Sequence, residues 1–166
     1  MLGLPLKRGT EAAFVAINNL FAAADDIRSV KADAIARACA GAGVTLDEIG
    51  PRRAHLYRDY LRYCLVDHHL SEDELARLSH LADVLGLAAQ ATAIVQRRVT
   101  REIYSKTVDA VLADARIDAD ERSFLEQMRD QLGIPRSIAE NIEAMKARQR
   151  EAWSGNPPGP KRRPDE

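Results

Sequence analysis

The sequence predicts an all-α protein, and three observations indicate this fold class. Aromatic residues make up only 5% of the 166 residues, whereas β-strands favour aromatic and β-branched side chains. Apolar residues recur at spacings of three and four along most of the chain, which is typical of amphipathic helices. A helical unit of about 47 residues also occurs twice. We therefore expect an array of six or seven helices with a tandem duplication, in a single domain over residues 10–153.

Composition excludes two broad classes of protein. Hydrophobic residues make up 46% of the chain, enough to build a core, so the chain as a whole is not disordered. Lys and Arg number 24 against 25 Asp and Glu, a net charge of -1. Such a balance creates no overall attraction for nucleic acid or for an anionic membrane.

The longest uncharged run, residues 12–24, is too short to span a bilayer. We therefore expect a cytoplasmic protein with no integral membrane segment.

The first fifty residues predict two helices and a connector. Residues 1–9 are expected to be a flexible N-terminus. A helix opens at Thr10 and presents one apolar stripe, formed by Phe14, Ile17, Leu20 and Phe21. A second helix is expected from Ser29 to about Ala40, ended by the glycines of residues 41–43. Residues 45–50 are a short connector, and Pro51 suits the first turn of a third helix.

The repeated unit is the clearest pattern in the chain. When residues 57–96 are placed on residues 104–143 without gaps, nine of 40 positions are identical; composition alone would give roughly two or three. The identical pairs include Tyr57 with Tyr104 and the Leu-Gly steps that end at residues 86 and 133. This similarity indicates an internal duplication of one helical unit.

Each unit predicts the same succession of elements. A helix ends near Asp67 or Asp114, and Leu70 or Ile117 then points inward. The next helix begins with a capping box, Ser71 with Glu74 or Asp118 with Glu121. Its buried face is predicted to comprise Leu75, Leu78, Leu81 and Leu85 in the first copy and Leu125, Met128 and Leu132 in the second. Gly86 and Gly133 are predicted left-handed C-caps.

Two further helices complete the prediction. One begins near Ala88, runs to about Ala113 and links the two units. The other follows Arg136 and carries Ile138, Ile142 and Met145. Residues 154–166, rich in Pro and basic side chains, are expected to form a disordered tail.

The acidic residues of the two turns are the first candidates for a site. Asp67, Glu74, Asp114 and Glu121 could bind a divalent cation if the turns met in space. An EF-hand is excluded, because positions one and three of such a loop would be Ala110 and Leu112. Helix capping and turn formation explain the same carboxylates more simply. We therefore favour a capping role and expect no resident cofactor.

Other candidate sites have simpler explanations. The four histidines, His55, His68, His69 and His80, lack the spacing of a zinc motif. Cys39 and Cys64 lie in apolar stretches and are expected to be buried thiols. The arginines of residues 52–62 and the basic residues 146–150 form basic helix faces, which we interpret as solvated faces and not as a nucleic-acid interface. We interpret three tyrosines as packing residues whose hydroxyl groups reach solvent: Tyr57, Tyr60 and Tyr63.

The duplicated segment resembles the TerB-like (tellurite-resistance) helical family. It is also similar to the helical repeats in the stromal part of an inner-envelope component of the chloroplast import machinery. The phrase that carries the resemblance reads roughly A-D-G-x-[IL]-x-x-x-E, and it matches residues 66–74 and 113–121, with His68 and Ala115 in place of its Gly. The resemblance covers residues 57–143. It implies a metal role for Asp67, Glu74, Asp114 and Glu121, membrane-associated stress responses, and multiprotein complexes mostly without a defined enzymatic activity.

From these observations we expect a non-catalytic module that binds another protein and could also bind its own copy. The rival hypothesis is a divalent-metal-dependent sensor or regulator that uses the acidic turns 67–74 and 114–121. No sequence motif supports acyl or phosphoryl chemistry, so an enzyme ranks third.

Overall fold

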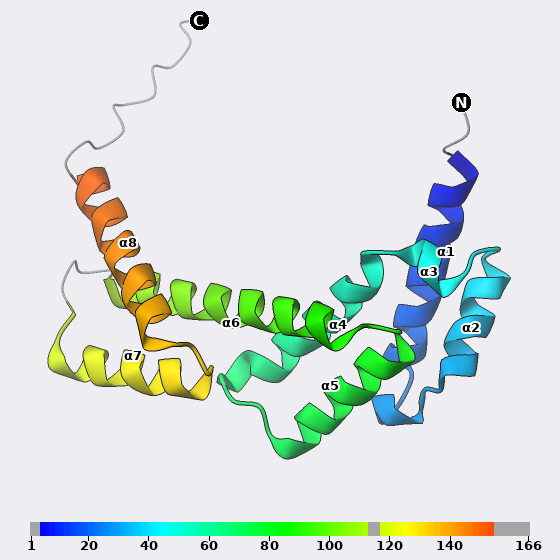
Figure 1. The fold of residues 1–166 in the computed structure, drawn as a ribbon, viewed down its shortest axis with the longest axis horizontal. Coiled ribbons are helices and arrows are strands. Elements are labelled where there is room, and N and C mark those ends of the chain that lie inside the picture. The colour runs from blue at the N-terminus through cyan, green and yellow to red at the C-terminus, as the bar shows by residue number, and fades with distance from the viewer. Residues whose placement is uncertain (1–3, 113–116, 155–166) are drawn as a thin grey trace, which may run out of the picture. The chain divides into compact units, whose positions relative to one another are not determined.

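The computed structural model describes residues 4–112 and 117–154, and these residues form helices and no strand. The all-α prediction is confirmed. The helices follow the chain in one order (Figure 1): α1 (Leu4–Ala22), the 3₁₀ helix η1 (Ile27–Ser29), α2 (Ala32–Gly41), α3 (Leu46–Ile49), α4 (Arg52–Cys64), the 3₁₀ helix η2 (Leu65–Asp67), α5 (Glu72–Val84), α6 (Ala89–Val111), α7 (Ala119–Gln131) and α8 (Arg136–Ser154). The described residues thus contain eight α-helices where six or seven were expected, and the additional helix is the four-residue α3.

The first three boundaries differ from the prediction. Helix α1 begins at Leu4 and not at Thr10, so part of the expected flexible N-terminus is helical. Helix α2 begins at Ala32 and not at Ser29, because Val30 and Lys31 have extended backbone. The expected connector 45–50 contains α3, which starts with a capping box of Thr45 and Glu48. The spacing of those two residues is the signal that would have predicted α3. The expected disordered tail, apart from Ser154 at the end of α8, lies outside the described residues.

The chain divides into two compact units, Met1–Val99 and Thr100–Glu166. The single domain expected over residues 10–153 therefore stays a prediction. In the first unit, α1 packs against α2, α3 and α4, and α5 packs against α4 and η1. Its core is formed by Ile17, Ile35, Leu56, Tyr57, Leu61, Leu65, Leu78, Leu81 and Leu85. In the second unit the buried side chains are Tyr104, Val108, Leu112, Leu125, Met128, Leu132, Ile134 and Ala139.

The predicted helix ends occur at both glycines. Gly86 and Gly133 have φ of 60° and 61°. At the end of α5, Leu87 N–H donates to Ala82 O at 2.9 Å; at the end of α7, Ile134 N–H donates to Arg129 O at 2.9 Å. These are Schellman motifs. A third motif ends α2, where Gly43 has φ of 70° and Val44 N–H donates to Cys39 O at 3.0 Å.

The predicted buried faces are correct except at one residue. Leu78, Leu81, Leu85, Leu125, Met128 and Leu132 are all buried. Leu75 is 47% exposed, so its assignment to the buried face was wrong. It lies in the first turn of α5, and burial there requires a neighbouring element that the helical pattern alone does not specify. Leu70 and Ile117 are both half-buried.

Candidate functional site

The two acidic turns are built as helix caps. Ser71 Oγ accepts a hydrogen bond from Glu74 N–H at 3.3 Å, and Glu74 Oε2 accepts from Ser71 N–H at 2.9 Å. Asp118 and Glu121 make the same reciprocal pair, at 2.8 and 2.9 Å. The hydrogen bonds from the Ser71 hydroxyl and backbone N–H lower the pKa of Glu74. Both glutamates therefore have the capping role that the sequence predicts.

The remaining candidate metal ligands do not form a metal-binding cluster in the part of the chain that the structure describes. Asp67 is exposed, and its Oδ1 accepts from His69 N–H at 3.1 Å, which closes a turn. Asp114 lies outside the described residues. Within residues 4–112 and 117–154, no three His, Cys, Asp or Glu side chains are close enough to hold a metal ion. The divalent-cation hypothesis stays a prediction.

His68 has an unusual backbone conformation. Its φ is 66° and its ψ is 11°, the left-handed region, and it is the one non-glycine residue with positive φ among the described residues. A side chain in this region is strained because its Cβ approaches the backbone. The sequence phrase of the TerB-like family has Gly at this position, which is the residue that adopts this conformation without strain.

The other histidines are dispersed. His55 and His69 are exposed. His80 is half-buried, and its Nε2 lies 2.9 Å from Val30 O. A carbonyl oxygen can only accept, so this nitrogen carries the proton. The bond ties α5 to the segment between η1 and α2.

Both thiols are buried, as expected. Cys39 and Cys64 are free cysteines with 2% and 3% of their surface exposed. Burial raises the pKa of Cys64 to about 11. A thiol with this pKa is almost entirely protonated at neutral pH and is a poor nucleophile.

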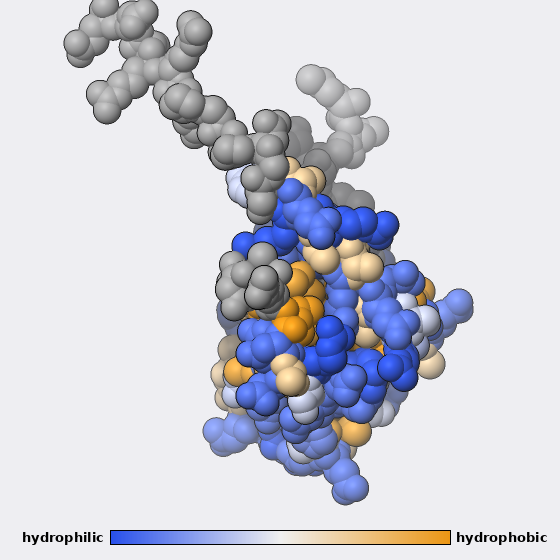
Figure 2. All heavy atoms as spheres, turned by 90° about the vertical axis from the view of Figure 1, so that its left-hand side faces the viewer, coloured by the Kyte–Doolittle hydropathy of each residue, from blue (hydrophilic) through white to orange (hydrophobic). Residues whose placement is uncertain are grey.

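The basic faces are largely engaged in ion pairs. On α4, Arg52 pairs with Glu11, Arg53 with Asp47 at 3.2 Å, and Arg58 with Asp59 at 2.9 Å. On α8, Lys146 pairs with Asp109 at 2.6 Å. Figure 2, which faces the side on which α7 and α8 lie, shows a mostly hydrophilic surface with a smaller hydrophobic area.

One hollow of the first unit is an apolar groove between α1 and α4. Its volume is about 290 Å³, and it is lined by Phe14, Asn18, Phe21, Ala22, Ile27, Leu56, Asp59, Tyr60, Tyr63 and Leu81; we call it the aromatic groove. Four of the eight aromatic residues of the whole chain lie in this lining. Aromatic side chains in a partly open hollow are typical of binding sites and of interface anchors.

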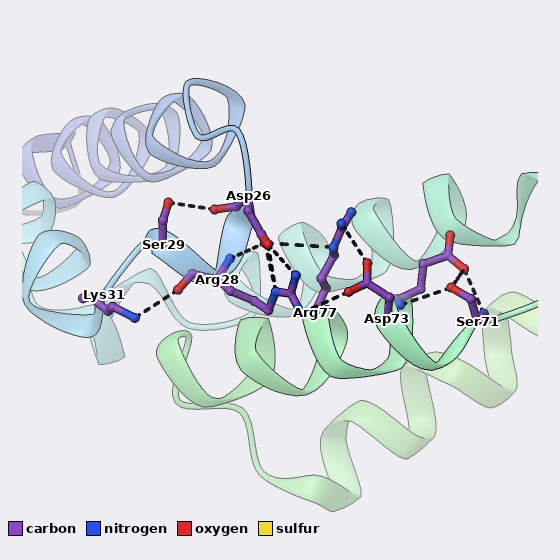
Figure 3. A network of polar contacts seen from close by, with 8 residues as sticks. Asp26, Arg28, Ser29, Lys31, Ser71, Asp73 and Arg77 are labelled. Carbon is purple, nitrogen blue, oxygen red and sulfur yellow. Dashed lines mark hydrogen bonds and ion pairs between the residues drawn. The ribbon is translucent and has the colours of Figure 1, made fainter.

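A network of ion pairs lies between η1 and α5 (Figure 3). Arg28 binds Asp26 through Nη2 at 2.6 Å and Asp73 through Nη1 at 3.0 Å, and Arg77 Nη2 binds Asp73 at 2.7 Å. The hydrogen bond from the Arg28 side chain is the main reason why the pKa of Asp26 falls to about 2. This network joins η1 to α5, the elements that supply Ile27 and Leu81 to the lining of the aromatic groove.

The edges of the aromatic groove differ in exposure. Tyr63 is 73% exposed, and its ring lies 6.1 Å from that of Tyr60. Tyr60 is half-buried, and its burial raises the pKa of its hydroxyl group, an effect that the nearby Arg77 partly offsets. The Arg52 guanidinium lies over the ring of Phe14, another lining residue, 5.7 Å from its centroid. The sequence prediction placed these aromatic residues in packing roles and did not bring α1 and α4 together.

The second unit contains a smaller, polar hollow around a buried tyrosine. The Tyr104 hydroxyl donates to Glu143 at 2.5 Å, and burial together with that carboxylate raises the pKa of Tyr104. The hollow measures about 60 Å³, and its charged lining comprises Arg122, Arg129, Arg136, Glu126, Glu140 and Glu143. This volume is that of about two water molecules, and the charges are balanced, so the hollow favours neither anions nor cations.

The chain matches no protein-family model, and no curated protein or solved structure is similar to it at a significant level. None of the helices in the described part of the chain combines the length and apolar character needed to cross a bilayer.

Proposed function

We propose that this chain is a non-catalytic protein-binding module of TerB-like type, and that the aromatic groove is its binding surface. The observation that carries the proposal is the gathering of Phe14, Phe21, Tyr60 and Tyr63 in one half-open hollow. Aromatic side chains supply most of the binding energy at protein interfaces, because they bury a large area at a small entropic cost.

The proposal includes the tandem duplication. Tyr57 and Tyr104 are both buried, and each is hydrogen-bonded to a side chain 39 positions later: Gln96 Nε2 donates to Tyr57 at 2.8 Å, and Tyr104 donates to Glu143. Gln96 and Glu143 are also 47 positions apart. Together with the paired capping boxes and Schellman motifs, this supports a common origin of residues 57–96 and 104–143.

The TerB-like assignment is supported by the backbone at His68. The position that the family phrase gives to Gly has positive φ in this chain. We extend the proposal to a cytoplasmic setting in a stress-related or membrane-associated complex, which is what the resemblance implies.

The test compares two matched variants of the purified protein. Tyr63 and Val66 are 73% and 74% exposed and lie three residues apart, but only Tyr63 lines the aromatic groove. Their exposure means that Tyr63→Ser and Val66→Ser should both leave the fold intact. Partners captured by the wild-type protein are then identified and tested as purified proteins for direct binding.

We expect a partner whose affinity falls roughly tenfold or more with Tyr63→Ser and is unchanged with Val66→Ser. Partners that bind all three proteins equally, or no direct partner at all, would contradict the proposal.

A further inference from the structure

We draw no further inference here: the strongest candidate, the open and mostly apolar groove that α1 and α2 line around Ala16, Leu20 and Ala34 in the first unit, carries none because nothing in the structure shows what covers it.

Discussion

Replacing His68 with Gly should stabilise the protein. The left-handed conformation at φ 66° costs a non-glycine residue about 1–2 kcal/mol. Glycine avoids this cost but loses about 0.5–1 kcal/mol more backbone entropy on folding. The net gain in the free energy of unfolding is therefore between about 0 and about 1.5 kcal/mol, centred at about 0.7 kcal/mol. The backbone bond from His68 N–H to Leu65 O, at 3.1 Å, is available to either residue.

The adjacent residue supplies the control. His69 is exposed and has no positive φ, so His69→Gly should destabilise the protein by up to about 1 kcal/mol through backbone entropy alone. Urea unfolding followed by circular dichroism measures both variants, with the slope of the transition confirming that the unfolded states are comparable. Equal effects of the two substitutions, or a loss of stability in His68→Gly, would refute the reasoning that this turn is strained.

Four further predictions concern the caps, the network and the thiols. Ser71→Ala should cost about 1 kcal/mol, because a capping box is lost; an unchanged urea midpoint would contradict this. The folded protein holds the pKa of Asp26 at about 2, below its ordinary value of about 3.9, so its contribution to stability is complete above about pH 4 and disappears as the pH falls toward 2. Asp26→Asn should reduce the acid dependence of the unfolding free energy, and an unaltered pH profile would argue against the network. A thiol reagent should label Cys39 and Cys64 in the native protein far more slowly than in urea; rapid native labelling would show that α2 and α4 are not packed as described. Calcium, zinc or EDTA should leave the thermal midpoint unchanged if the acidic turns are only caps, since a ligand of the folded state raises it.

The local structure could largely be predicted from the sequence. Capping boxes and Gly C-caps depend on residues within six positions of one another, and these are visible in the sequence. Thus Ser71 and Glu74 were correctly assigned as a cap, and Gly86 as a helix end. The same signal, at Thr45 and Glu48, lies within the connector expected over residues 45–50 and marks the start of α3.

The aromatic groove could not be predicted in this way. Phe21 and Tyr60 are nearly 40 residues apart, and each has the spacing of an ordinary packing residue on its own helix. Periodicity shows that a helix has an apolar face, but it does not show which element covers that face or leaves it open. Leu75 demonstrates the same limit, because its spacing predicts burial and yet nearly half of its surface is exposed.

The most direct test of the aromatic groove as a binding surface is an NMR titration of the full-length protein with a purified partner that binds it directly. The largest backbone amide shifts should lie in α1 at residues 14–22 and in α4 at residues 56–63. Shifts concentrated in α7 and α8, or in the capped turns, would contradict the account.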